Sequence, residues 1–385
     1  MASILNTLMR QTFQISLIAV LAFTGSLCLA AAQDFTPAND SVVVEVLSNR
    51  VKPVAATAES AAETAKQQIK LARAHADPRY LGRAQAILAP WWGKADMPPA
   101  LAILQATVEQ SRHEFSAART TLQAALKRDP SQAQGWLTLA TLERVAGQYG
   151  AADIACQKVG AHGAALYAMA CQLETASLQG KFTEARAGFS KLQNQTGDAP
   201  IQAWLLSLLA ESEERAGLDA AAQKAYQTSL HLADDGYTAL ALADLLLRTA
   251  QPDAALKVLA KQANSDSVMV RRAYAHKQLG DVRWNTLWAE LRERFSALDA
   301  RGDDPRLHAR ELALAALWLE ANPGKALAAA QSNLQIQKEP LDWWLAFSSA
   351  DAAGRKDDTL AFQKQLQSNG LRDARLARWL PSTKL

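Results

Sequence analysis

Residues 58–378 carry a repeating pattern of apolar and polar positions. Alanine and leucine dominate segments of about 12–16 residues, and Gly, or Asp and Pro, separates one segment from the next. Alanine and leucine favour helices, whereas glycine and proline mark the places where helices end. The pattern therefore predicts an all-α fold built from many short helices.

The helical segments repeat with a period close to 34 residues. In one copy Gly147 marks a turn, the aromatic Tyr149 follows two positions later, and Ala152 comes three positions after that. Other copies place alanine equivalently, at Ala84, Ala118, Ala185, Ala222, Ala255 and Ala326. Two helices of about 13 residues with their turns fill such a period. We count nine helix pairs, of which the one between Gly280 and Asp304 is the least regular.

The alanine and aromatic positions indicate how these helices pack. Alanine fits where the two helices of a pair cross most closely, because a larger side chain finds no room there. The aromatic ring fills the space between one pair and the next. Because each pair leaves an apolar face uncovered, successive pairs must stack into a solenoid.

The turn, aromatic and alanine positions together resemble the tetratricopeptide-repeat family over about residues 60–375. The family's early tryptophan and leucine have counterparts in Trp136 and Leu139 of one copy and in Trp343 of another. Most other copies lack this tryptophan, so the resemblance rests on the remaining positions. It implies a right-handed helical-repeat solenoid of about nine tetratricopeptide-like helix pairs.

Two short blocks carry a narrower resemblance. Ala89-Pro90-Trp91-Trp92 and Asp234-Asp235-Gly236-Tyr237 look like segments of a group of exported bacterial tetratricopeptide-repeat proteins. This resemblance implies a compartment and a fold, and it implies no particular activity.

The N-terminus has the layout of a secretory signal peptide. Arg10 precedes an apolar run from Ile15 to Phe23, and Ala30-Ala31-Ala32 supply small residues for cleavage. We place cleavage after Ala32, which makes residues 1–32 the signal peptide. An uncleaved anchor is the alternative, but the apolar run is short for a span of about 20 residues. We therefore expect an exported protein, in the periplasm of a Gram-negative bacterium, with no membrane span after cleavage.

Two segments flank the predicted solenoid of residues 58–378. Residues 33–57 contain a β-branched stretch from Ser41 to Leu47, but one isolated strand is not stable alone. We interpret them as an extended or disordered N-terminal arm, with docking on the body as the alternative. We interpret residues 379–385 as a C-terminal tail.

Composition and motifs narrow the classes of function. The formal net charge of +3 is too small to indicate a nucleic-acid binder or a protein held on anionic membranes. The six histidines include no helical pair spaced for a metal ion. The sequence contains no phosphate-binding glycine loop, nucleophile elbow or Cys-x-x-Cys motif. We therefore expect no enzyme activity, no metal and no cofactor.

Cys156 and Cys171 remain after removal of residues 1–32, which contain Cys28. An oxidising compartment would permit a disulfide between them. Cys156 lies about five residues before the predicted turn and Cys171 about eight after it, so their heights on antiparallel helices are similar but not matched. The sequence leaves the pairing open, and the apolar surroundings of both favour two buried thiols.

The family resemblance also implies a ligand surface, because the first helix of each pair lines the concave face of these solenoids. The family's groove positions correspond in this sequence to aromatic residues and to acids two turns later, namely Tyr167 and Glu174, Trp204 with Glu211 and Glu214, and Tyr237 and Asp244. Carboxylate-clamp members of the family present lysine and asparagine there instead. A groove of rings and acids would favour a basic or amphipathic segment. The alternative is that the rings are packing and the acids a solvated face.

These features predict an exported, non-catalytic scaffold that binds a protein or peptide through its concave groove. The alternative is an architectural subunit of an envelope secretion or polysaccharide-export complex that uses its outer and end surfaces. An enzyme is a third hypothesis, which a deep pocket with desolvated carboxylates would favour. The sequence identifies neither the partner nor the oligomeric state.

Overall fold

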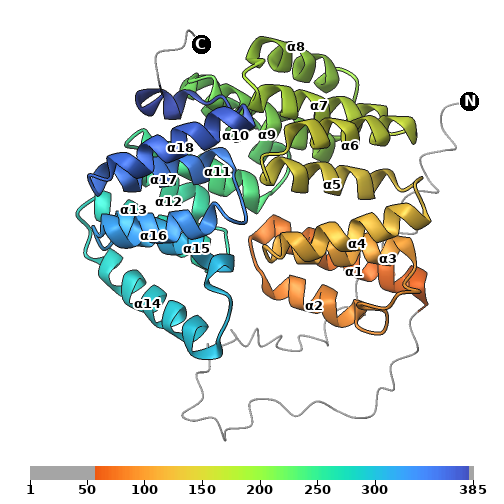
Figure 1. Ribbon diagram of the computed structural model, residues 1–385, viewed down its shortest axis with the longest axis horizontal. Helices are drawn as coiled ribbons and strands as arrows, with labels where there is room; N and C mark the ends of the chain where they lie inside the picture. Colours follow the sequence, from red (N-terminus) through yellow and green to blue (C-terminus); the bar gives the residue numbers. More distant parts are fainter. Residues whose placement is uncertain (1–56, 381–385) are drawn as a thin grey trace, which may run out of the picture. The chain divides into compact units, whose positions relative to one another are not determined.

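Between residues 57 and 380 nine helix pairs follow one another, as the repeat predicts (Figure 1). The computed structural model describes residues 57–380, and all regular elements in that range are helical. The predicted signal peptide and nearly all of the predicted N-terminal arm lie outside it. The α-helices are α1 (Ala58–His75), α2 (Arg79–Leu88), α3 (Pro99–Ser111), α4 (Phe115–Arg128), α5 (Ala133–Val145), α6 (Tyr149–Ala161), α7 (Ala165–Leu178), α8 (Phe182–Gln193), α9 (Ala199–Arg215), α10 (Asp219–Leu232), α11 (Gly236–Arg248), α12 (Pro252–Leu259), α13 (Asp266–Gln278), α14 (Arg283–Arg301), α15 (Ala309–Trp318), α16 (Pro323–Asn333), α17 (Pro340–Ala352) and α18 (Lys356–Asn369).

The turn between the two helices of a pair uses the left-handed backbone conformation. Gly147 and Gly180 have φ angles of 74° and 88°, which glycine adopts without a steric penalty. Where a repeat lacks the glycine, His113 and Ala250 occupy the same place at φ angles of 63° and 55°. The small or polar residue at this position of the repeat therefore makes the turn, as the sequence predicts.

The repeated alanines are buried at the crossings of the helices. All seven have no exposed surface, namely Ala84, Ala118, Ala152, Ala185, Ala222, Ala255 and Ala326. The seventh pair, α13 and α14, departs from this pattern. On α14 the buried residues are Leu291 and Phe295, which explains why the sequence reads as irregular there.

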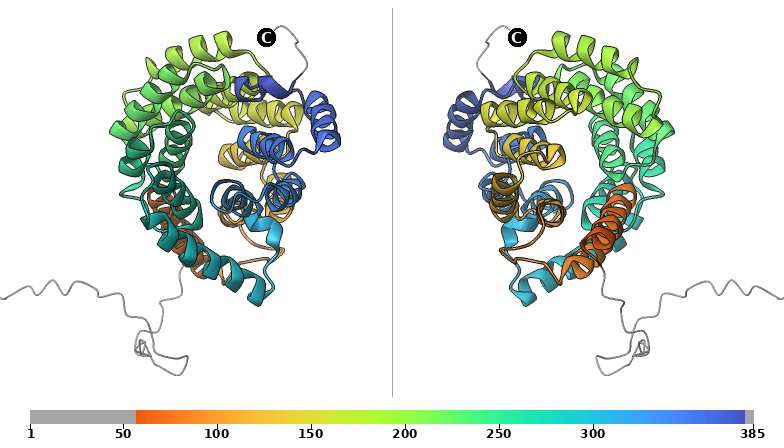
Figure 2. Two further views of the ribbon diagram at one scale, coloured as in Figure 1. Left: turned by 90° about the vertical axis from the view of Figure 1, so that its left-hand side faces the viewer. Right: turned by 90° about the vertical axis from the view of Figure 1, so that its right-hand side faces the viewer.

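The array curves because its first helices lie closer together than its second helices. Successive first helices, such as α5, α7 and α9, pack directly against one another, whereas successive second helices do not pack to this extent within residues 57–380. A stack that is tighter on one side bends toward that side. The first helices therefore form the inner, concave face, and Figure 2 shows the pairs following one another round this curve.

The curvature brings the last pairs back to the middle of the array. The backbone N–H of Lys338 donates to the carbonyl of Val145, at 2.7 Å, and that of Arg372 donates to Leu178, at 2.8 Å. In Figure 1 the left-hand ends of α5 and α6 face the last helices of the array. The repeat pattern does not predict this closure, because the closure depends on small rotations summed over several pairs.

The first helix also contacts a distant pair. The carbonyl of His75, at the end of α1, accepts a hydrogen bond from the backbone of Ala263, at 3.0 Å. The Arg73 guanidinium pairs with Asp235, which caps the start of α11, at 2.8 Å. Both ends of the described array are therefore anchored on the helices between them.

The C-terminal boundary of the solenoid lies beyond the predicted one. A 3-10 helix, η2 (Ala374–Trp379), follows α18, and the ring of Trp379 stacks on Phe347 with centroids 5.4 Å apart. Trp379 is buried in the same apolar cluster as Trp343 and Phe362. Trp379 therefore belongs to the packed body, together with Leu380, which packs against the same cluster, rather than to the predicted tail of residues 379–385.

Candidate functional site

The inner face of the middle pairs contains most of the residues that the sequence singles out. Tyr167 and Glu174 lie on α7, Trp204 and Glu211 on α9, and Tyr237 and Asp244 on α11. In each helix the acid follows the ring by seven residues, which is close to two turns, so both lie on one side of the helix. The structure therefore gathers three rings and three acids along three neighbouring first helices.

Each of these acids already has an arginine partner. Glu174 pairs with Arg144 of α5 at 2.8 Å, and Glu211 pairs with Arg215, one turn further along α9, at 3.4 Å.

Asp244 holds Arg271 of α13 through two hydrogen bonds of 2.7 Å each. The three arginines are buried, whereas the carboxylates that they neutralise keep some exposure. The surface is therefore less acidic than its acids alone suggest, and charge alone gives a basic partner little advantage.

Glu211 has a shifted acidity on this face. Burial, the largest cause, and the nearby negative charge of Glu174 together raise the pKa of Glu211 from 4.5 to about 7, while Arg215 opposes the shift. In turn, the negative charge of Glu211 is the largest cause that raises the pKa of Tyr237. Glu211 thus changes its protonation near neutral pH, at the centre of the inner face.

The three aromatic residues do not form one continuous ladder. The rings of Tyr167 and Trp204 lie 5.5 Å apart and bridge α7 and α9. Tyr237 lies instead under the guanidinium of Arg73 from α1, at 5.9 Å. The exposed aromatic surface therefore has two parts, the contacting pair of Tyr167 and Trp204 and, apart from it, Tyr237 beside Arg73.

Glu214 is a structural residue, contrary to its assignment as a groove residue. Its carboxylate accepts a hydrogen bond from the Tyr226 hydroxyl, at 3.2 Å, and pairs with Arg248 and Arg375, at 3.1 and 2.9 Å. It is buried, and these three partners occupy its oxygens. Glu214 follows Glu211 by three residues, so a short shift around the helix turns its side chain toward η2.

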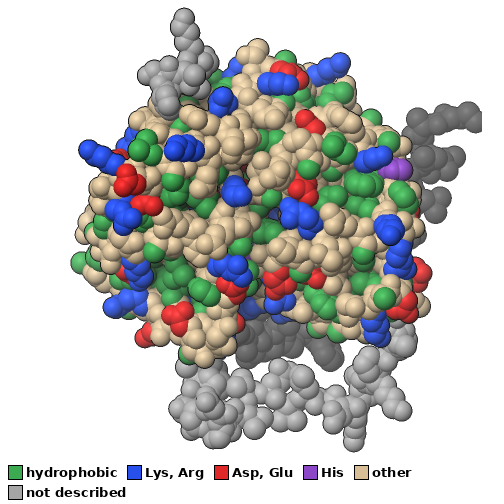
Figure 3. All heavy atoms as spheres, viewed as in Figure 1, with side chains coloured by type: hydrophobic (Ala, Val, Ile, Leu, Met, Phe, Trp, Pro, Cys, Tyr) green, Lys and Arg blue, Asp and Glu red, His purple; other side chains and the backbone are tan. Residues whose placement is uncertain are grey.

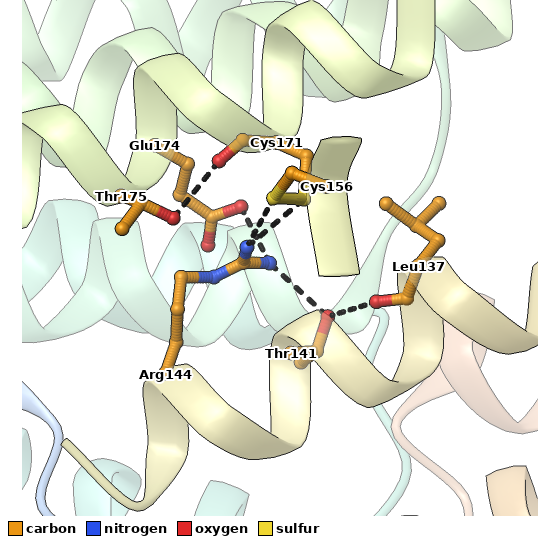
Figure 4. The surroundings of a disulfide bond; sticks show 7 residues. All are labelled: Leu137, Thr141, Arg144, Cys156, Cys171, Glu174 and Thr175. Carbon is orange, nitrogen blue, oxygen red and sulfur yellow. Dashed lines mark hydrogen bonds and ion pairs between the residues drawn. A yellow bond between two sulfur atoms is a disulfide. The ribbon is translucent and has the colours of Figure 1, made fainter. Parts of the chain in front are cut away.

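A disulfide joins the third and fourth pairs beside this face. Cys156 of α6 and Cys171 of α7 are bonded, with Cα atoms 5.6 Å apart, which corrects the expectation of two buried thiols. Although the two cysteines lie at unequal distances along the chain from the turn, their Cα atoms are close enough for the bond. Figure 4 shows Arg144 between this disulfide and Glu174, with Nη1 3.3 Å from the Cys171 sulfur and Nη2 3.1 Å from the Thr141 hydroxyl.

The sequence pointed to some of these partners and missed others. Arg215 follows Glu211 by four residues, a spacing that predicts an ion pair on a helix. Arg271 gave no such signal, because its partner Asp244 lies 27 positions away and on another helix.

Between residues 57 and 380 no group of three or more His, Cys, Asp or Glu side chains is placed to hold a metal ion. In the same range no helix combines the length and the apolar character that a membrane crossing needs. The face shown in Figure 3 mixes basic and acidic side chains without a large region of one sign.

Comparisons with known proteins bear on the fold. No protein-family model and no curated protein matches the chain. Among solved structures, a Rap protein complexed with competence and sporulation factor is 11% identical with a TM-score of 0.50, covering 81% of this chain and 88% of that one. A tetratricopeptide repeat protein from Parabacteroides merdae is 11% identical with a TM-score of 0.38, covering 65% and 98%. PilF of Pseudomonas aeruginosa is 18% identical with a TM-score of 0.37, covering 52% and 94%. At these identities the likeness is one of fold alone.

Proposed function

We propose that this chain, which has the fold of a tetratricopeptide-repeat solenoid, is an exported, non-catalytic scaffold that binds an amphipathic protein or peptide segment on its inner face. Repeat arrays of this kind act as protein-interaction scaffolds, because their stacked pairs present one long curved surface.

The observation that carries the proposal is the aromatic pair of Tyr167 and Trp204. Tyr167 is 37% exposed although its ring contacts Trp204, and aromatic rings left partly uncovered are frequent anchors for a partner. Seven residues after each ring, Glu174 and Glu211 keep 17% and 16% of their side chains exposed. A segment with apolar residues for the rings and occasional basic residues for the acids fits both features.

The experiment compares two exposed positions on the same helix. Tyr167→Ser removes a ring of the inner face, whereas Met169→Ser, two residues later and 41% exposed, changes a different side of α7. The chain beginning at Gln33 is used to capture partners from the envelope of its source cells, and the captured protein is identified. We expect Tyr167→Ser to weaken capture about tenfold and Met169→Ser to leave it unchanged. Equal effects of the two variants would contradict the proposal.

An architectural role remains a second candidate, and one observation favours it. Leu279 and Val282, at the turn between α13 and α14, are 40% and 75% exposed, so an apolar patch lies at an edge of the array. Val282→Ser should leave peptide capture intact if the inner face is the binding surface. Loss of capture with Val282→Ser, and not with Tyr167→Ser, would identify this edge as the binding surface.

Export is proposed from residues 1–32, and the disulfide between Cys156 and Cys171 supports it, because disulfides persist in oxidising compartments. N-terminal sequencing of the protein from a periplasmic fraction should give Gln33 as the first residue. Recovery of the uncleaved chain from the cytosol would contradict export.

A further inference from the structure

A second site lies where the curved array meets its own last pair. A cavity of about 340 Å³ separates the turn between α5 and α6 from the end of α18. Gly147 and Tyr149 line it from the turn, Asn369 lines it from α18, and Lys338 and Trp343 line it from the start of the last pair. The hydrogen bond from Lys338 to Val145 joins the same two regions of the chain. The cavity therefore exists only because the array closes on itself.

Three polar atoms of the lining side chains have no hydrogen-bond partner among residues 57–380. They are the Tyr149 hydroxyl, the Trp343 indole nitrogen and the Asn369 amide nitrogen. Tyr149 is only 3% exposed and Trp343 is fully buried. Buried polar groups are nearly always satisfied in proteins, because an unsatisfied one costs free energy. Three such atoms around one cavity indicate that a polar molecule completes them.

All three groups can donate a hydrogen bond. An indole N–H and an amide NH₂ only donate, and burial raises the pKa of the Tyr149 phenol, so this group keeps its proton. The side-chain oxygen of Asn369 accepts from the Leu371 backbone at 3.0 Å. The amide nitrogen of Asn369 faces Gly147. A Cβ atom placed on Gly147 would lie 3.2 Å from this nitrogen.

The charge of the lining favours an anion. Lys338 is the one charged residue among those that line the cavity, and no acid is among them. Arg215 and two acids act on Tyr149 from outside the lining, but each has its own partner. Arg215 pairs with Glu211, Glu339 pairs with Arg310, and Asp373 pairs with Arg375 at 2.6 Å. Their charges are therefore compensated within the protein, and the Lys338 ammonium remains for a ligand.

We propose that this cavity binds a small, singly charged carboxylate and that the bound carboxylate holds the α5–α6 turn to the last pair. Its two oxygens accept hydrogen bonds from the donors contributed by Tyr149, Trp343 and Asn369, and its charge is balanced by Lys338. A doubly charged anion would leave one charge uncompensated in a partly buried site. The volume lies within the range of small-molecule sites in proteins. This site is separate from the inner face, so the proposal does not depend on the proposed function.

The test uses three probes of related size. Butyrate carries the proposed group, butyramide has the same shape without the charge, and inorganic phosphate supplies a larger anionic charge. Binding to the full chain is measured by calorimetry at constant ionic strength, together with the indole N–H signals in a nitrogen–proton correlation spectrum. We expect butyrate to bind, to shift one indole signal and to raise the unfolding temperature. Equal binding of butyramide, stronger binding of phosphate, or no binding of any probe would overturn the proposal.

Variants place the binding in this cavity. Lys338→Gln and Tyr149→Phe should each weaken butyrate binding about tenfold. Lys338→Gln removes the positive charge that balances the carboxylate, and Tyr149→Phe removes one hydrogen bond to it. Tyr226→Phe is the matched control, because Tyr226 is equally buried but donates to Glu214 outside the cavity. It should lower stability and leave butyrate binding unchanged. Unchanged binding in Lys338→Gln would also overturn the proposal, whether or not Tyr149→Phe folds.

Discussion

Cys156, on the second helix of the third pair, is bonded to Cys171, on the first helix of the fourth, with Cα atoms 5.6 Å apart. The bond fixes α6 to α7 at the position where Arg144 reaches between the disulfide and Glu174. It therefore connects the framework of the array to the inner face.

The disulfide should stabilise the folded state measurably. It closes a loop of 15 residues in sequence separation, for which chain entropy gives about 3 kcal/mol. We expect the Cys156→Ala, Cys171→Ala double variant of the chain beginning at Gln33 to lose about this amount in denaturant unfolding. Reductant should destabilise the parent chain and leave the variant unaffected. Two free thiols in the oxidised, denatured parent chain would exclude the bond.

The alanine at the helix crossing should not tolerate a larger side chain. Ala152 has no exposed surface, so Ala152→Leu should overpack the α5 and α6 crossing and cost about 1–3 kcal/mol. Ala151 is exposed one position earlier, and Ala151→Leu is the matched control, which should change stability little. Denaturant midpoints of the two variants make the comparison. Equal midpoints would contradict the assigned crossing.

Glu211 should make stability fall as the pH rises. Its pKa is about 7 in the folded protein and 4.5 ordinarily, so between these values the folded state binds more protons than the unfolded state. Stability from this group is therefore present below about pH 4.5 and is lost as the pH rises through 7. At pH 8, Glu211→Gln should be more stable than the parent chain by about 1–3 kcal/mol.

The same pair of proteins should differ little at about pH 3.5, where Glu211 is mostly protonated in both states. Glu184→Gln, at an exposed position on α8, controls for the loss of one negative charge. Thermal unfolding across this pH range measures all three proteins. A constant difference between Glu211→Gln and the parent chain at every pH would show that Glu211 does not titrate there.

Trp379 should be needed for the last pair. Its ring is buried against Phe347, so Trp379→Ala should cost about 3–5 kcal/mol. Lys364→Ala, at an exposed position of α18, should be nearly neutral. Unfolding in denaturant compares the two. A neutral Trp379→Ala would return this residue to the tail that the sequence predicted.

Much of the fold follows from relationships that lie within one repeat. Gly147 and Ala152 lie five positions apart, and the backbone and side-chain sterics that they reflect are local. The pair count, the turn positions and the buried alanines were therefore predictable. The rings and acids of the candidate site could be placed on one helix side for the same reason, since seven residues make about two turns.

The partners of those groups were not predictable in the same way. Asp244 meets Arg271 of the next pair, and Glu214 turns away from the groove to meet Arg375, far along the chain. The cysteine pairing depended on the relative heights of α6 and α7, which bring the two Cα atoms within 5.6 Å of each other. Each contact is decided by the relative placement of two helices, which the pattern of either helix alone leaves open.

By itself, the sequence determined that the chain stacks helix pairs, because a 34-residue spacing of small and aromatic residues permits few other arrangements. Only the tertiary structure decided that the array returns upon itself, so that Lys338 meets Val145 and a polar cavity forms between them. The physical reason is accumulation. Each pair turns slightly relative to the last, and the sum over many pairs, which no local pattern records, sets where distant residues meet.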